Sequence, residues 1–496
     1  MGALTSKPYA FSARPWELKS FDSIDLNDAV GSNIRVDMRG LDIMRVLPRV
    51  NELLNESWIT DKVRFAYDGL SLQRLGSPLF RRRLSDSFSS ISWTKALSSV
   101  RAYFPFSESF SGVAFSEHSS FEDLSLVKHT FGLFRPSLVH WDASTDILGN
   151  WFLDSKDYDF SNFDFFLILG VNLRFELPSL NLRIRKVSRS ARPVPVFYSG
   201  SIGGDSNILT YSAINVGSLE RFWSEFYSGR SKLCRKFYSS KRPCVLMSRS
   251  VYLSLLTSVL PLSVLDALSN CTLKVLLDCS SRGSLNDLAI SEGSALSTLF
   301  YKAASTTSLF NFGSDNKRFS GSLFTTYMGF HGDQGADAAN LVIPALHPYE
   351  SAKSSYINVY GQFQSILKVR TFSRFVADVR SLIFSAFGAP ISLGFCSYAS
   401  EVPLYLFRML RYYEVSESFL YGNILGVKLI YNYNRYFNSG FSAIYKNYSR
   451  ALFHFMAGAL FNSTGYSFYF DSSTARASHL MAVSHNRFKN LTSFGC

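Results

Sequence analysis

The chain has 496 residues, of which 47% are hydrophobic and 18% are charged. This length and composition exclude an intrinsically disordered protein and a single small domain, and they favour an ordered globular protein with several hydrophobic cores. The net charge of +13 comes from scattered basic residues without a zinc-finger, helix-turn-helix or RNP pattern, so we expect no nucleic-acid partner.

The first predicted elements form a β-hairpin near the N-terminus. In residues 31–47 apolar and charged side chains alternate, which places Asp37 on the charged face, and Gly40 supplies a turn. Pro48 is expected to end the second strand. The pattern predicts a small β-rich module over residues 20–76.

After residue 90, apolar runs of strand length alternate with segments of helical period. Continuous apolar strands between helices indicate parallel sheets that are covered on both faces. We therefore predict an α/β body over residues 77–370 and an aromatic-rich, mainly helical C-terminal region over residues 371–496. The predicted strands of the body are residues 163–169, 245–247, 273–277, 323–328 and 341–343.

Candidate ligand-binding residues follow the strand at 163–169. Gly170 and Asn172 lie where its carboxyl end is expected, which is the edge at which open α/β sheets bind ligands. A βα turn needs the same small and turn-forming residues, so a purely structural role stays open. His331 is followed by Gly-Asp-Gln-Gly, which indicates a hydrogen-bonding loop, with a base or metal ligand as the alternative.

The cysteines do not indicate a metal centre. Iron–sulfur clusters and zinc sites usually require closely spaced Cys or His ligands, and no C-x-x-C pair occurs here. We therefore expect no metal site, no catalytic residues and no cofactor in this chain. We also expect no direct membrane span, because no purely apolar stretch of 18 residues occurs. The cysteines are Cys234, Cys244, Cys271, Cys279, Cys396 and Cys496.

Residues 2–76 carry a specific resemblance. The stretches GALTSKPYAFSARPWEL (2–18) and ESWITDKVRFAYDGL (56–70) are similar to the large 75-kDa iron–sulfur subunit of mitochondrial respiratory complex I. Later stretches resemble the same family in the same order. The resemblance therefore covers the whole chain, strongly over the first 76 residues and patchily afterwards. The later stretches are LILGVNLRFELPSLNLRIRK (167–186), GFHGDQGADAANLVIPALHPYESAKSSYINVYGQFQ (329–364) and DSSTARASHLMA (471–482).

The resemblance implies a molybdopterin oxidoreductase-like, formate dehydrogenase-like α/β body that follows the β-rich module. It also implies the C-terminal half of a split subunit, with residues 1–19 as the linker from a separate, cluster-bearing N-terminal half. In the family, Gly2, Ala3, Leu4, Thr5 and Ser6 follow an element whose Cys ligates a cluster, so these five residues are expected beside a cluster. Iron–sulfur clusters are then expected in the partner half and none in this chain.

The implied function is that of a structural and interface subunit of proton-translocating NADH:ubiquinone oxidoreductase, non-catalytic by itself. Expected partners are the cluster-bearing half and other peripheral-arm subunits, including the NADH/flavin-binding and quinone-module subunits. The implied location is the matrix side of the mitochondrial inner membrane, and the high Phe content fits a gene in the mitochondrial genome. Gly170 and Asn172 would belong to a vestigial cofactor cleft. The alternatives are an active molybdopterin-dependent oxidoreductase and a basic nucleic-acid-binding protein.

Overall fold

The structure is a computed structural model in which the described residues form two compact units. Unit 1 comprises Met1–Ile147, Asp278–Ala389 and Tyr466–Cys496, and unit 2 comprises Leu148–Leu277 and Pro390–Gly465. The structure describes residues 5–103, 110–134, 139–141, 160–171, 173–174, 176–190, 192–199, 212–213, 232–248, 251, 271–276, 279–287, 306–315, 324–351, 353–369, 376, 469–470 and 472–493.

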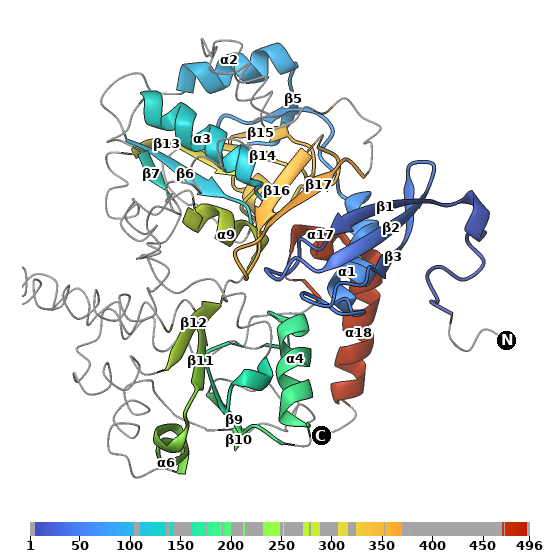
Figure 1. The fold of residues 1–496 in the computed structure, drawn as a ribbon. Helices are drawn as coiled ribbons and strands as arrows, with labels where there is room; N and C mark the ends of the chain where they lie inside the picture. The colour runs from blue at the N-terminus through green and yellow to red at the C-terminus, as the bar shows by residue number, and fades with distance from the viewer. Residues whose placement is uncertain are drawn as a thin grey trace, which may run out of the picture. The chain divides into compact units, whose positions relative to one another are not determined.

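The N-terminal module of unit 1 is a three-stranded antiparallel sheet in the order β1-β2-β3 (Figure 1). Its strands are β1 (Lys19–Ile24), β2 (Asn33–Arg39) and β3 (Asp42–Pro48). Strand β2 buries Ile34, Val36 and Met38 in one hydrophobic cluster, and Gly40 takes a positive φ of 63° in the turn. The predicted hairpin and its apolar face are therefore confirmed.

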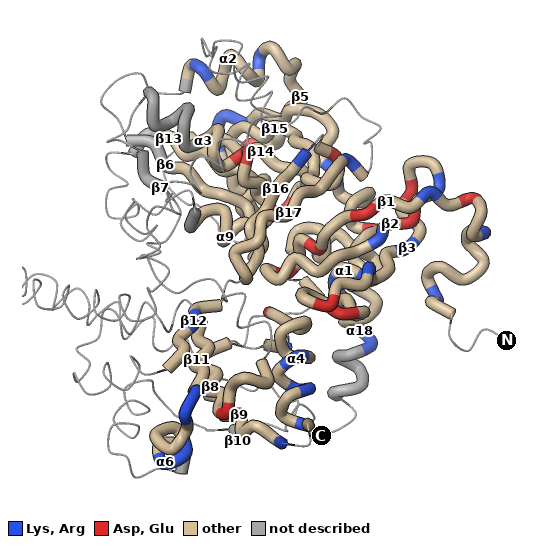
Figure 2. The backbone as a smooth tube through the Cα atoms, in the orientation of Figure 1, with Lys and Arg blue, Asp and Glu red and all other residues tan. Residues whose placement is uncertain are grey.

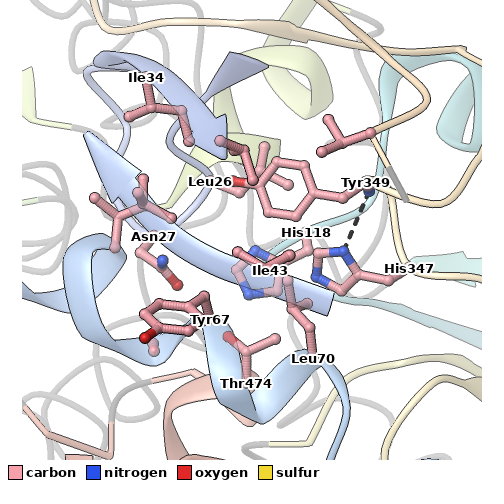
Figure 3. A pocket seen from close by; sticks show the side chains of 15 residues that line it. Leu26, Asn27, Ile34, Ile43, Tyr67, Leu70, His118, His347, Tyr349 and Thr474 are labelled. Atoms are coloured by element: carbon pink, nitrogen blue, oxygen red, sulfur yellow. Dashed lines mark hydrogen bonds between the residues drawn. The ribbon is translucent and has the colours of Figure 1, made fainter. Parts of the chain in front are cut away.

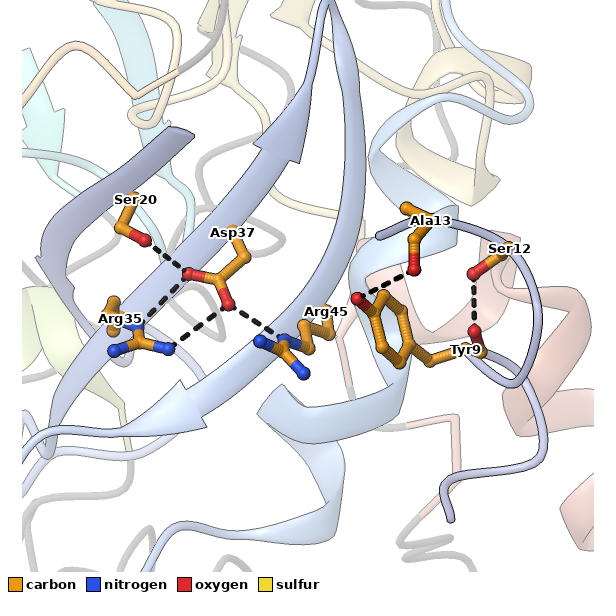
Figure 4. Close-up of polar contacts among 7 residues, drawn as sticks. All are labelled: Tyr9, Ser12, Ala13, Ser20, Arg35, Asp37 and Arg45. Atoms are coloured by element: carbon orange, nitrogen blue, oxygen red, sulfur yellow. Dashed lines mark hydrogen bonds and ion pairs between the residues drawn. The ribbon is translucent and has the colours of Figure 1, made fainter. Parts of the chain in front are cut away.

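Asp37 lies on the charged face of β2, but its side chain is only 1% exposed (Figure 4). Its carboxylate accepts hydrogen bonds from Arg35 Nε at 3.0 Å, Arg45 Nε at 2.7 Å and Ser20 Oγ at 2.8 Å. The Arg45 guanidinium also lies 4.6 Å from the centre of the Tyr9 ring. Burial acts to raise the pKa of Asp37, but these hydrogen bonds outweigh burial and lower it.

Two buried carboxylates occupy the connection between β1 and β2. Asp25 Oδ1 accepts the backbone N–H of Asn27 at 2.8 Å, and Asp28 Oδ1 accepts those of Val30 and Gly31 at 3.1 and 3.2 Å. Burial raises the pKa of Asp25 to about 6. Burial and the nearby Asp25 charge together raise the pKa of Asp28 to about 8.

These raised pKa values predict that unit 1 loses stability as the pH increases. A carboxyl group with a higher pKa in the folded state stabilises that state at low pH, and the contribution disappears as pH rises through the folded pKa. Asp28→Asn should therefore flatten the fall in melting temperature between about pH 4 and pH 8. Melting curves across this range test this prediction, with Asp42→Asn at the exposed start of β3 as the control. Parallel curves for the Asp28→Asn variant and the parent would refute the prediction.

The body of unit 1 is built on a seven-stranded sheet in the order β5-β4-β15-β14-β13-β6-β7. Neighbouring strands from β15 to β7 are parallel, whereas at the other edge β4 pairs antiparallel with both β15 and β5. The strands are β4 (Leu79–Phe80), β5 (Ser89–Ser90), β6 (Phe110–Phe115), β7 (Val139–Trp141), β13 (Thr306–Phe312), β14 (Phe324–Gly329) and β15 (Leu341–Pro344).

The described part of unit 1 also contains helices and a second hairpin (Figure 1). The hairpin pairs β16 (Lys353–Ile357) with β17 (Phe363–Leu367). The helices are η1 (Pro15–Glu17), α1 (Asp61–Phe65), η2 (Ala66–Leu70), α2 (Trp93–Tyr103), α3 (Phe121–Phe134), α9 (Ser280–Asp287), α11 (Gln334–Asp337), α17 (Ser473–Ala477) and α18 (His479–Ser493).

Unit 2 is a five-stranded, all-parallel sheet in the order β10-β9-β8-β11-β12. All five residues of β8 are buried, which explains why its sequence is continuously apolar. The elements are η4 (Phe160–Asn162), β8 (Phe165–Leu169), α4 (Pro178–Ser188), β9 (Val196–Ser199), β10 (Ser212–Ala213), α6 (Lys232–Ser239), β11 (Pro243–Ser248) and β12 (Thr272–Leu276).

The predicted α/β class, with a β-rich module before parallel sheets, is thus confirmed. The division into four consecutive segments stays a prediction. Of the predicted C-terminal region 371–496, only residues 376, 469–470 and 472–493 are described. Among the described helices, none combines the length and apolar character that a membrane span needs.

Candidate functional site: a polar cavity at the carboxyl ends of parallel strands

A polar cavity of about 210 Å³ lies in unit 1, beside the carboxyl ends of β6 and β13. Ser116 follows β6 directly, and Asp315 follows β13 after a short turn. Arg282 of α9 and Arg476 of α17 add positive charge to the lining. Parallel α/β sheets bind ligands at this edge, so the cavity is the candidate site of unit 1.

The turn after β13 is held by its own polar groups. Asn311 Nδ2 donates to the carbonyl of Ser314 at 2.9 Å, and Asn311 Oδ1 accepts the Ser314 N–H at 2.7 Å. Gly313 takes a φ of 75°, and an added Cβ would lie 3.3 Å from the Cβ of Ser116. A side chain at residue 313 would therefore strain the backbone and crowd the cavity wall.

Asp315 shares a buried hydrogen bond with Tyr327 of β14. The Tyr327 hydroxyl donates to Asp315 Oδ1 at 2.9 Å and lies 3.2 Å from the His331 carbonyl oxygen. Burial raises the pKa of Asp315 to about 7, and the Asp333 charge adds to the shift. Burial and the Asp315 charge also raise the pKa of Tyr327 well above its usual value. The pair therefore keeps at least one proton near neutral pH.

The loop after β14 connects three distant parts of unit 1. His331 Nε2 donates to the carbonyl of Gly69 at 2.7 Å, and burial lowers the pKa of His331 to about 4. Asp333 caps α11 and forms an ion pair with Arg476. These contacts support the hydrogen-bonding interpretation of this loop. In the described part of the chain, no three His, Cys, Asp or Glu side chains gather as metal ligands would.

A second cavity, beneath the N-terminal sheet, is far smaller, at about 30 Å³ (Figure 3). Its lining is mostly apolar and includes Ile34, Ile43 and Leu70. On its opposite side the Tyr349 N–H donates to His347 Nδ1 at 3.2 Å. A volume of this size holds about one water molecule. It is therefore a packing gap where the module meets the body, and the polar cavity remains the candidate site.

The predicted cleft residue Gly170 lies at the carboxyl end of β8, as expected. Its φ is 66°, and an added Cβ would lie 2.5 Å from Val251 Cγ2 and 2.9 Å from Ser248 Oγ. Backbone conformation and packing thus account for this glycine without a ligand. Asn172 lies outside the described residues.

Of the five residues expected beside a cluster, Gly2, Ala3 and Leu4 lie outside the described residues. Thr5 and Ser6 are exposed, and the Ser6 carbonyl accepts the N–H of Tyr9 at 3.1 Å, which begins a turn. Among the described cysteines, Cys234, Cys244 and Cys271 are buried, Cys279 is half-buried, and none of these four forms a disulfide.

Sequence reasoning missed the residues of the polar cavity. Strand β13 is absent from the strands predicted from the sequence. The Gly-Ser-Asp after it was therefore not recognised as the carboxyl end of a strand, where ligands bind. A reading of Thr306–Phe312 as a strand before a polar turn would have identified Asp315. Arg476 lies 143 residues from its partner Asp333, and no local pattern connects them.

Two family models match the chain. A molybdopterin oxidoreductase model matches residues 74–377. A model described as NADH-ubiquinone oxidoreductase NDSU1/NuoG-like, 4Fe-4S domain, matches residues 18–68. The second match covers the three-stranded sheet and α1.

Curated relatives agree with both models. The NADH-ubiquinone oxidoreductase 75 kDa subunit of Reclinomonas americana is 33% identical over an alignment of 400 residues, which covers 74% of this chain and 56% of that protein. The 75 kDa subunit of Acanthamoeba castellanii is 34% identical, over 74% of this chain and 55% of that protein. The mitochondrial 78 kDa subunit of Candida albicans is 34% identical, over 74% and 52%. The chain thus spans about half the length of the curated relatives it matches.

The match to a 4Fe-4S domain corrects the expectation that this chain has no iron–sulfur cofactor. The domain points to an iron–sulfur cluster in this chain. The expectation was wrong because it rested on the spacing of cysteine ligands alone. The 4Fe-4S family model instead recognises the sequence of the surrounding domain, residues 18–68. However, residues 18–68 contain no Cys and no His, so this segment does not fit the usual thiolate ligand set of a cluster.

The family assignment follows from the extent of the match. The molybdopterin oxidoreductase model covers more than half of the chain and includes all described strands of the seven-stranded and five-stranded sheets. The fold has the parallel sheets and the polar edge that this class of α/β protein uses. The chain belongs to the molybdopterin oxidoreductase family, and its relatives include the 75-kDa and 78-kDa subunits of NADH-ubiquinone oxidoreductase.

Proposed function

We propose that this chain is a subunit of NADH:ubiquinone oxidoreductase, complex I, and that it supports electron transfer from NADH to ubiquinone. The observation that carries the proposal is the 33–34% identity to three complex I subunits over about three quarters of the chain. Both family models lie in the order expected for such a subunit. The chain acts as a structural and interface component of the peripheral arm and does not oxidise NADH by itself.

The polar cavity supports a role in structure rather than catalysis. Its Asp315 carboxylate accepts the Tyr327 hydroxyl, and its Arg476 pairs with Asp333, so these groups hold the fold together. Gly170 and Asn172 belong, in this proposal, to a vestigial cofactor cleft of unit 2. The loop Gly2–Ser6 lies beside an iron–sulfur cluster of the assembled complex.

The proposed partners are a separate polypeptide equivalent to the cluster-bearing half of the relatives, together with NADH/flavin-binding and quinone-module subunits. Large hydrophobic side chains are exposed in and directly before the N-terminal module, with Phe11 at 108%, Trp16 at 75% and Trp58 at 59%. Exposed apolar residues of this size favour contact with another protein. The proposed location is the matrix side of the mitochondrial inner membrane.

Native electrophoresis of solubilised mitochondrial membranes tests this function. The chain, detected by an antibody, should migrate in the same high-mass band as in-gel NADH dehydrogenase activity. Digitonin and a harsher detergent should give the same co-migration, because a subunit held by specific interfaces stays bound. A chain that migrates entirely apart from this activity under both conditions would refute the proposal.

A further inference from the structure

The amino-terminal edge of the sheet in unit 2 carries a concentration of positive charge (Figure 2). Six basic residues there are all exposed. We call this set the basic edge. It consists of Arg189, Arg192, Arg235, Lys236, Lys241 and Arg242.

Topology brings these residues to one edge. In a parallel sheet with crossover helices, the helix carboxyl ends and the segments before the strands all lie at the strands' amino ends. Arg189 caps the end of α4, and Arg192 precedes β9. Lys236 lies in the last turn of α6, and Lys241 and Arg242 directly precede β11.

The described part of unit 2 contains few acidic residues. Among the residues described in unit 2, the acidic ones are Asp164 and Glu176, against many more basic residues. Asp164 lies at the edge, where its carboxylate accepts the backbone N–H groups of Lys241 at 2.7 Å and Arg242 at 3.0 Å. It thereby fixes the turn that presents both cationic side chains to the surroundings.

Helix dipoles explain only part of this charge. Cations near a helix carboxyl end are favourable, which accounts for Arg189 and Lys236. Arg192, Lys241 and Arg242 lie outside α4 and α6, so the dipoles of these helices do not explain them. Concentrated like charge disfavours the folded chain by self-repulsion unless something opposite neutralises it. A partner of negative charge would neutralise the basic edge.

We propose that the basic edge docks an acidic protein surface, namely that of a neighbouring subunit in the complex. The inference rests on the proposed function, because membership in a multisubunit complex supplies the neighbour. Four of the six residues are arginines, whose guanidinium groups match carboxylates in a two-bond geometry. Tyr238 on α6 is 56% exposed and Leu182 on α4 is 42% exposed, and such apolar side chains complement protein interfaces.

Zero-length carbodiimide cross-linking of the purified complex tests the partner's chemistry. This reagent joins a lysine amine to a carboxylate only where the two are in contact. Mass spectrometry should find Lys236 and Lys241 linked to Asp or Glu of another polypeptide. If both lysines instead react freely with an amine reagent in the intact complex, the docking proposal fails. If nuclease or phospholipase treatment makes Lys236 and Lys241 reactive, the partner is RNA or lipid and not an acidic protein. That result would also overturn the proposal.

A matched pair of variants tests the energetic contribution. The measured quantity is the NaCl concentration at which half of the chain is released from the complex. The double variant Lys241→Gln, Arg242→Gln should lower this concentration by about two-fold, because it removes charges from a contact that salt screens. Arg82→Gln with Arg83→Gln removes two adjacent, exposed charges from unit 1 and should leave the release unchanged. Equal release for the two variants refutes the docking role. Cross-links to a carboxylate-rich protein that is not a complex I subunit would retain the docking surface and reject the proposed function.

Discussion

Replacement of Arg74 by methionine is expected to destabilise unit 1 by about 3–5 kcal/mol, because it leaves a buried carboxylate without its partner. Arg74 Nη1 and Nη2 lie 2.8 and 2.6 Å from the two carboxylate oxygens of Glu350. The two side chains are only 3% and 1% exposed. Arg74 also donates to the carbonyls of Leu70 at 2.9 Å and Phe330 at 3.1 Å. One side chain thus connects the end of the N-terminal module to β14 and to the segment before β16.

Urea unfolding of the whole chain checks this prediction, with the unfolding of unit 1 measured by limited proteolysis. Arg49→Met is the matched control, because Arg49 and Asp22 form an ion pair at 3.0 Å whose side chains are 54% and 58% exposed. Exposed pairs contribute about 0–1 kcal/mol, so this variant should resemble the parent. Similar unfolding of the two variants would show that the buried pair does not hold the module to the body.

Replacement of Gly69 by alanine is expected to displace the C-terminal helices from the N-terminal module. An added Cβ would lie 2.0 Å from the Thr474 carbonyl oxygen and 3.1 Å from the Ser478 nitrogen. Both neighbours are backbone atoms: Thr474 belongs to α17, and Ser478 follows it directly. A small side-chain movement therefore cannot relieve the clash. Overpacking of this kind costs about 1–3 kcal/mol, and more where backbone must move.

Hydrogen exchange of residues 472–493 measures the displacement. The Gly69→Ala variant should exchange these amides faster than the parent. Gly332→Ala serves as the control, since an added Cβ there would meet only Leu75 Cδ2 at 3.5 Å, an ordinary contact distance. Unchanged protection of α17 and α18 in the Gly69→Ala variant would contradict the close approach of these segments.

The sequence predicted the elements whose burial creates a local pattern. Strand β8 is continuously apolar because both of its faces are covered, and β2 alternates because its two faces differ. These two patterns were sufficient for the fold class. The resemblance supplied the order of module and body, which composition alone does not contain.

The contacts that join distant segments had no such pattern. Arg74 and Glu350 are 276 residues apart, and the burial of Asp37 depends on Arg45 and Tyr9 folding over one face of the sheet. The cluster expectation failed for a related reason. Cysteine spacing tests for ligands, whereas the match to residues 18–68 identifies a scaffold.

The central claim is that this chain is part of NADH:ubiquinone oxidoreductase. Purification of that complex through a tag on a different subunit, followed by quantitative mass spectrometry, tests it most directly. We expect this chain at one copy per flavin-binding subunit, in preparations that reduce ubiquinone with NADH. A chain that is absent from active complex, or that purifies alone with one molybdenum per polypeptide, would contradict the account and favour a molybdopterin-dependent oxidoreductase.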